Sequence, residues 1–384
     1  MSSAGSNAKQ VENCDVLIVG GGPAGSTCAR ELKRTGLDVV VMDKSSFPRD
    51  KVCAGWITPQ VVQTLQIDAG EYAKDRVFQP ITGFATGLVG GSEVRTRYAQ
   101  PVSYGIRRCE FDHYLLQRSG ARLLSGVALK TLVREGEGWL VNGSIRAPLV
   151  VGAGGHFCPV ARSLGADLGH AEQVVAAQEI EFEMSPQQAE QCRLQGALPE
   201  LFFCRDLKGY GWCFRKGNFL NIGLGREDNH KLHEHVAAFC DFLQAKGKIP
   251  AAALTRFKGH AYLLYGHAKR ETVADGALLV GDAAGLAYVQ SGEGIRPAIE
   301  SALIAARVIA GAAKDYRRAA LLPYQRQLEA RLGAVKTGAS LSDRIPEKFK
   351  QAVGQKLLAN PWFARHVVLD RWFLHLQQPA LATG

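Results

Sequence analysis

The feature that most constrains the fold is a glycine cluster between two short apolar runs near the N-terminus. The residues 16–19 (VLIV) have the pattern of a buried strand, the sequence GGGPAG follows, and a helical pattern leads to a second strand that ends at Asp43. A strand, tight turn, helix and second strand of this length form a βαβ unit of about thirty residues. The unit predicts a Rossmann-like α/β domain whose first turn can hold a phosphate.

Each glycine of this turn has a separate physical role. Gly20 permits the tight turn, Gly22 allows a pyrophosphate to approach the backbone, and Gly25 lets the helix pack on the strand. The start of the helix offers free N–H groups to an anion. An acid about 20 residues after the turn is placed to accept hydrogen bonds from a ribose. The expected nucleotide-binding residues here are Gly20, Gly22, Pro23, Ala24, Gly25, Asp43 and Lys44. The motif alone leaves open whether the dinucleotide is NAD or FAD.

Composition indicates a globular protein that resides in a reducing compartment. The chain has 384 residues, of which 46% are hydrophobic and 21% charged, which suits two or three packed units. No apolar run has the length of a transmembrane helix, and residues 1–13 are expected to be a flexible tail without a secretory signal. The nine cysteines include no CxxC pair, so neither a disulfide framework nor a metal site is expected. We therefore expect a cytoplasmic protein.

The formal net charge of +10 favours acidic partners. A phosphorylated substrate, an anionic membrane surface and an acidic electron-donor protein all fit this charge. Nucleic acid is not expected, because the chain has no recognition-helix, RNA-binding or zinc-finger pattern.

Four motifs in order resemble the flavoprotein superfamily with the glutathione-reductase type of FAD fold, in its hydroxylase-like branch. They are GGGPAG, an RxxFD segment that begins at Arg108, a GAGG turn, and GDAAG, which begins at Gly281. The resemblance implies that FAD is the cofactor. It also implies that Asp282 hydrogen-bonds the ribitol or pyrophosphate region, that Arg108 lies along the cofactor, and that the backbone of Leu129 meets the adenine.

A long helix is expected to begin near Gly294, just after the GDAAG segment. Gly292, Gly294 and Ile295 would then present N–H groups that stabilise negative charge on the reduced isoalloxazine. Two structural alternatives stay open: the glycines can form a packing kink, and Asp282 also suits a helix N-cap.

Two further stretches are similar to motifs of the geranylgeranyl reductase family. They are FPRDKVCAGWITP and GYGWCFRKGNFLNIGLG. In the first, Cys53 is the candidate catalytic thiol over the flavin, with inert packing as the alternative. In the second, Tyr210, Trp212 and Phe214 alternate along a strand and therefore share one face. With Trp56 they are expected to line the pocket of an apolar substrate, unless this face is only core.

The chain also departs from the family pattern. The departures are Ala54 for a glycine, Trp56 for a small residue, Gly154 for an aspartate, Arg215 for a proline and Val289 for a proline. They leave the flavin site intact but weaken the assignment of the substrate, because Trp56 would narrow the cavity.

The resemblance and the residues together predict a domain organisation. The FAD-binding domain is expected from residues 14–74, 105–170 and 262–315, a substrate-side β-sheet domain from 75–104 and 171–261, and a helical region from 316–384. The last region combines basic residues with Trp362, Phe363, Trp372 and Phe373. Its helices are expected to cover the sheet edge or the cavity mouth, with peripheral membrane contact as the alternative.

The expected function is that of an FAD-dependent oxidoreductase that reduces C=C bonds in an apolar, prenyl-type substrate by hydride transfer from flavin N5. The alternative is a monooxygenase or halogenase-like enzyme of the same fold, acting on an aromatic or apolar secondary metabolite. The chain lacks a WxWxIP motif and has GAGG for GADG, which favours a reductase. A flavin-binding protein without catalysis stays open, and so does the electron donor, NADPH or a ferredoxin-like protein.

Overall fold

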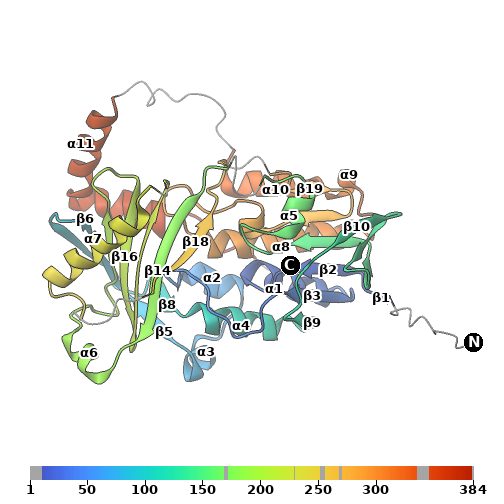
Figure 1. Ribbon diagram of the computed structural model, residues 1–384, viewed down its shortest axis with the longest axis horizontal. Helices are drawn as coiled ribbons and strands as arrows, with labels where there is room; N and C mark the ends of the chain where they lie inside the picture. Colours follow the sequence, from blue (N-terminus) through green and yellow to red (C-terminus); the bar gives the residue numbers. More distant parts are fainter. Residues whose placement is uncertain are drawn as a thin grey trace, which may run out of the picture.

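The computed structural model describes residues 11–167, 172–228, 230–250, 256–267, 270–334 and 346–382. Within them the chain forms two large sheets that lie toward opposite ends of the molecule, with long helices beside them (Figure 1). The fold is the expected α/β class with a second, inserted sheet.

The first large sheet has six strands in the order β19-β20-β13-β2-β3-β9 and is parallel except at the edge pair β19 and β20. Its strands are β2 (Val16–Val19), β3 (Val39–Asp43), β9 (Arg122–Ser125), β13 (Leu149–Gly152), β19 (Val273–Ala274) and β20 (Ala277–Leu279). Helices α1 (Pro23–Arg34), α4 (Arg108–Arg118) and α8 (Ile295–Gly311) pack together, with α1 in contact with both others. The central strands are apolar and buried, as in parallel sheets that are covered on both faces.

The second large sheet has seven strands in the order β18-β14-β17-β16-β15-β6-β7. Its strands are β6 (Gly83–Leu88), β7 (Glu93–Arg97), β14 (Val175–Glu183), β15 (Glu200–Phe203), β16 (Gly209–Lys216), β17 (Phe219–Arg226) and β18 (Lys258–Tyr262). Strands from both expected segments join in this sheet, but residues 78–81 and 103–106, at the ends of the first segment, pair in a separate small sheet. The sheet is antiparallel except where the segments meet, at β15 and β6, because a long connection permits parallel pairing there. Helix α7 (Leu232–Ala245) packs on one face of the sheet.

Two smaller sheets complete the strands. One contains β1 (Glu12–Asn13), β12 (Ile145–Ala147), β11 (Gly138–Val141) and β10 (Leu132–Glu135); the other contains β4 (Trp56–Ile57), β8 (Ser103–Ile106) and β5 (Phe78–Ile81). Of the expected flexible tail, residues 1–10 lie outside the described residues. Glu12 and Asn13 instead form a strand, because they pair with Ile145 and Arg146.

The C-terminal region is helical. It contains α9 (Arg318–Leu321), α10 (Pro323–Leu332), α11 (Glu347–Leu358), α12 (Pro361–Phe363) and the π-helical segment η3 (Ala364–Phe373). Helices α11 and α12 and the segment η3 pack along β6 and β7, where Phe373 joins a buried aromatic cluster with Trp56. The remaining short helices are α2 (Pro59–Thr64), α3 (Ala69–Asp75), α5 (Pro159–Ser163), α6 (Pro186–Gln191) and the 3-10 turn η1 (Gly281–Ala283).

Candidate functional site

A cavity of about 380 Å³ lies between the phosphate-binding turn and the inner face of the seven-stranded sheet. Most of the residues expected from the sequence line it. They are Gly20, Gly22, Pro23, Ala24, Asp43, Lys44, Cys53, Trp56, Arg108, Tyr210, Trp212, Asp282, Gly292, Gly294 and Ile295. Gly25, Leu129, Phe214 and Gly281 are not among the lining residues. The cavity thus joins the two parts of the fold that the sequence assigned to cofactor and substrate.

Two glycines of the first turn, Gly20 and Gly25, could not be replaced without displacing the backbone. Gly20 has a φ of +114°, and an added Cβ would collide with the backbone of Ala153. A Cβ on Gly25 would collide with the carbonyl oxygen of Gly20. Gly25 therefore packs the helix onto the turn and does not itself face the cavity.

The N-terminus of α1 faces the cavity without a side-chain cap. Gly22 is the N-cap residue, and an added Cβ there would meet only Arg49 Nη2, at 3.5 Å. Asp43 accepts hydrogen bonds from the backbone N–H groups of Gly21 and Ser45, both at 2.8 Å, and so fixes the turn. Open space, free N–H groups and a fixed carboxylate fit the diphosphate and ribose of a dinucleotide.

The second helix start, at α8, faces the same cavity. Gly294 is its N-cap residue, and Asp282 Oδ1 lies 3.1 Å from where a Gly294 Cβ would be. The expected free N–H groups are partly used: the Arg296 N–H donates to Glu293 Oε1 at 2.7 Å, and the Gly292 N–H donates to the Tyr288 carbonyl at 2.8 Å. Gly281 has another role: its added Cβ would lie 3.1 Å from the Cβ atoms of Ala24 and Ala298. Gly281 therefore permits the close approach of α1 to α8, while Asp282 is the residue of this segment that faces the cavity.

Basic side chains gather along the cavity. Arg108 makes a two-point ion pair with the fully buried Asp112, at 2.8 and 2.9 Å, and Arg49 lies 3.4 Å from the same carboxylate. Lys51 Nζ lies 2.8 Å from His260 Nε2, and burial lowers the pKa of Lys51 to about 8. Neither Lys51 nor His260 was expected from the sequence. Their positive or proton-donating groups suit a cofactor that carries two phosphates.

Leu129 and Phe214 lie outside the cavity, as Gly25 and Gly281 do. Leu129 packs on the core of the six-stranded sheet, although the loop before it passes close to the turn, because the Val127 N–H donates to Asp43 O at 2.9 Å. Phe214 shares the sheet face of Tyr210 and Trp212 but packs behind Trp56, with ring centroids 5.6 Å apart. The apolar wall of the cavity is therefore formed by Trp56, Tyr210 and Trp212.

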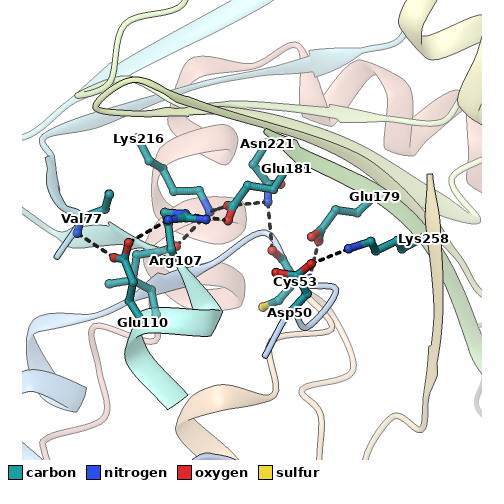
Figure 2. A network of polar contacts seen from close by, with 11 residues as sticks. Asp50, Cys53, Val77, Arg107, Glu110, Glu179, Glu181, Lys216, Asn221 and Lys258 are labelled. Carbon is teal, nitrogen blue, oxygen red and sulfur yellow. Dashed lines mark hydrogen bonds and ion pairs between the residues drawn. The ribbon is translucent and has the colours of Figure 1, made fainter. Parts of the chain in front are cut away.

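A polar network holds the loop that carries Cys53 (Figure 2). The Cys53 N–H donates to a Glu179 carboxylate oxygen, and Asn221 Nδ2 donates to the Cys53 carbonyl at 3.2 Å. Asn221 Nδ2 also donates to Glu181 at 3.1 Å, and Asn221 Oδ1 accepts from Trp212 Nε1 at 2.7 Å. Strands β14 and β17 therefore fix both the peptide groups of Cys53 and one ring of the apolar wall.

The charges of this network are balanced at the buried Lys216. Its ammonium donates to Glu181 at 2.6 Å and to the Ile106 carbonyl at 2.9 Å. Sequence analysis missed Glu179, Glu181 and Asn221. The available signal was the alternation of three acids with apolar residues on one strand, in AAQEIEFE, which places Glu179, Glu181 and Glu183 on one sheet face.

Protonation of Glu179 is expected to control part of the pH dependence of stability. Burial raises its pKa from 4.5 to about 8, against the opposing charge of Lys216. A raised folded-state pKa means that the fold binds the proton more tightly than the unfolded chain. The stabilisation is present below about pH 4.5 and is lost as the pH rises through about 8. The free energy of unfolding, measured with a denaturant, is expected to fall less steeply with pH over this range in Glu179→Gln than in the wild type.

The matched control is Glu183→Gln, which changes an exposed acid on the same strand. It should keep the wild-type slope of unfolding free energy against pH. An unchanged slope in Glu179→Gln would show that Glu179 is not the group responsible.

Comparison with known proteins gives the family context of this site. Residues 13–87 match a family described as an FAD binding domain. A menaquinone reductase of Mycobacterium tuberculosis is 29% identical, over 78% of this chain and 77% of the relative. A digeranylgeranylglycerophospholipid reductase of Methanocaldococcus jannaschii is 27% identical, over 89% of this chain and 91% of the relative.

Solved structures show the same fold. A geranylgeranyl bacteriochlorophyll reductase-like protein from Thermoplasma acidophilum has a TM-score of 0.71 and 19% identity, covering 96% of this chain and 93% of that one. A probable FAD-dependent monooxygenase from Pseudomonas aeruginosa has a TM-score of 0.66 and 20% identity, covering 90% of this chain and all of that one. The resemblance and the FAD cofactor expected from the sequence are thus confirmed. The fold alone does not separate a reductase from a monooxygenase.

Two features are absent from the described ranges. None of their helices combines the length and apolar character needed to cross a bilayer. In the same ranges, no three His, Cys, Asp or Glu side chains lie together in a way that could hold a metal ion.

Proposed function

We propose that this chain, an FAD-dependent oxidoreductase related to the geranylgeranyl reductases, reduces carbon–carbon double bonds in an apolar, prenyl-type chain. The observation that carries the proposal is the apolar wall of Trp56, Tyr210 and Trp212, which shares one cavity with the N-termini of α1 and α8. Such a wall can hold an alkene without polar groups beside a cofactor seated on the helix starts. The names of the two reductase relatives support the same substrate class.

FAD, when bound, supplies the electron pair of the reduction as a hydride. The chain's own residues bind the cofactor and orient the substrate beside it. The N-terminus of α1 and the side chains of Arg49 and Arg108 would hold the diphosphate, with Asp43 at the ribose and Asp282 at the ribitol region. At the start of α8 the Arg296 N–H already donates to Glu293 Oε1, so this helix would act on the cofactor through its dipole.

The aromatic wall and the Cys53 loop act on the substrate side. Trp56, Tyr210 and Trp212 exclude water and hold the chain of the substrate by apolar contact. The network from Glu179 and Asn221 holds the Cys53 peptide in place, and the Gly55 N–H donates to Cys53 Sγ at 3.4 Å. We assign to Cys53 the delivery of a proton from its thiol to the second carbon of the double bond.

The electron donor is proposed to be NADPH or an acidic ferredoxin-like protein. Both are anionic, and both fit the net charge of +10. A cytoplasmic location would supply either donor and would keep the nine cysteines reduced.

Product mass tests the proposed function. Dithionite-reduced enzyme is incubated without oxygen with a menaquinone and with a geranylgeranyl glycerophospholipid. At least one of these lipids is expected to gain two hydrogen atoms per turnover, and Cys53→Ala is expected to retain FAD and to lose most of this turnover. A product that forms only in air and carries an oxygen atom would instead assign the monooxygenase chemistry.

A further inference from the structure

The outer face of helix α11 is an apolar stripe that the described part of the chain leaves uncovered. Phe349, Val353 and Leu357 are 62%, 39% and 39% exposed, and Trp362, just beyond the helix, is 66% exposed. The first three are spaced by four residues and therefore follow one side of the helix. Large apolar side chains grouped on one exposed face mark an interaction surface.

The opposite face of α11 is the one that packs on the protein. Leu358 is buried, and an added Cβ on Gly354 would meet Leu207 Cδ1 at 2.5 Å. At about 100° per residue, both positions point away from the centre of the exposed stripe. Figure 1 shows α11 at the edge of the molecule, beside the seven-stranded sheet. The stripe is therefore the outer face of α11, and the inner face is the one that packs on the protein.

The positive charge around the stripe favours an anionic partner. Between residues 346 and 373 there are five lysines and arginines against two acids, which gives a net charge of +3. Lys348, Lys350 and Lys356 lie on α11 itself. A helix with an apolar stripe, an exposed tryptophan and flanking lysines fits an anionic lipid surface, where the rings enter the headgroup region and the lysines meet the phosphates.

The inner side of α11 also leads to the cavity. Leu207, which touches Gly354, lines a small second pocket of about 70 Å³ together with Phe203 and Val289. This pocket shares Tyr210, Tyr262, Ser291 and Gly292 with the large cavity. Tyr210 and Ser291 line both spaces, and the Tyr210 hydroxyl donates to the Ser291 carbonyl at 2.5 Å.

We infer that the outer face of α11, with Trp362, docks this protein on an anionic bilayer, beside the pocket that leads to Tyr210 and the cavity. The purpose of this docking rests on the proposed function, since a prenyl lipid resides in a bilayer. The docking itself is measured without turnover.

Vesicle binding tests the inference on the full-length holoprotein. Co-sedimentation is measured with vesicles of phosphatidylcholine alone and of phosphatidylcholine mixed with phosphatidylglycerol. The wild type is expected to bind the mixed vesicles more tightly, and less so at high salt. The variant Phe349→Ser/Trp362→Ser is expected to bind them at least about tenfold more weakly, because two aromatic rings no longer enter the bilayer.

The matched control is Val133→Ser, which removes an equally exposed apolar side chain, 53% exposed, from β10. It should bind the vesicles as the wild type does. The double variant should keep its FAD and its turnover of detergent-dispersed lipid, so a failure of the proposed chemistry is distinguished from a failure of docking. Equal vesicle binding by the double variant and the wild type would overturn the inference. It would also be overturned if the double variant lost a dimer in sedimentation equilibrium and kept its vesicle binding.

Discussion

A Gly22→Asp variant is expected to fold normally and to lose FAD. Gly22 is the N-cap of α1 in an extended conformation that any residue can adopt, with a φ of −73° and a ψ of −171°. Aspartate is a preferred N-cap residue, so the FAD-free variant should be as stable as the wild type or about 0.3 kcal/mol more stable. Its carboxylate would occupy the space proposed for the diphosphate. Two unit charges about 4 Å apart repel by about 4 kcal/mol at an effective dielectric constant of about 20, which corresponds to roughly a thousandfold weaker FAD binding.

The measurement is the flavin content of purified protein and the dissociation constant of FAD from the stripped protein. Gly22→Asn is the matched control, because it has nearly the same size and no charge. It should weaken FAD binding far less than the aspartate does. Wild-type FAD affinity in Gly22→Asp would show that the diphosphate does not lie at the start of α1.

An Asp112→Ala variant is expected to lose about 3–5 kcal/mol of unfolding free energy. Asp112 is fully buried and holds Arg108 at 2.8 and 2.9 Å, with Arg49 at 3.4 Å. Removal of the carboxylate leaves the buried Arg108 guanidinium without its two-point partner. Loss of a buried ion-pair partner is costly because the remaining charge keeps its desolvation penalty. Urea unfolding of the variant and the wild type at one pH measures the difference.

Asp75→Ala is the control for this loss. It removes an exposed aspartate at the end of α3 and should change the unfolding free energy by no more than about 0.5 kcal/mol. Asp112→Asn keeps a hydrogen-bond acceptor but no charge. Its loss of unfolding free energy should lie between those of Asp112→Ala and Asp75→Ala. A loss below about 1 kcal/mol in Asp112→Ala would mean that Arg108 finds another partner.

The parts of the site that depend on local backbone geometry could be predicted from the sequence. The glycines of the first turn and the acid at the end of β3 are linked by short-range spacing, and the GDAAG segment likewise precedes a helix start. Side-chain alternation along β16 also predicts that Tyr210, Trp212 and Phe214 share a face. The alternation does not show, however, which of these side chains reach the cavity and which are buried behind another residue. Phe214 lies behind Trp56 because this residue of the distant strand β4 occupies the space in front of it.

The parts that depend on long-range pairing could not be predicted. The network at Cys53 needs β14 and β17 in a register that sets Glu181 opposite Asn221, and it needs a loop more than 100 residues away to reach them. The parallel pairing of β15 with β6 is a similar case, since it joins two chain segments whose alignment no local pattern specifies. From the sequence, the C-terminal region showed basic and aromatic residues but not the stripe of α11. Its free face follows from the burial of Leu358 and the contact of Gly354 with Leu207 on the other side.

The most direct test of the central claim is the reoxidation of the flavin without oxygen. The reduced holoenzyme is mixed with a prenyl lipid in a stopped-flow instrument under nitrogen, and the oxidised flavin spectrum is followed. The proposed function predicts that the oxidised spectrum returns at a rate that rises with the concentration of the alkene, and that a fully saturated analogue has no effect. A flavin that stays reduced with the alkene and reoxidises only when oxygen is admitted would contradict it.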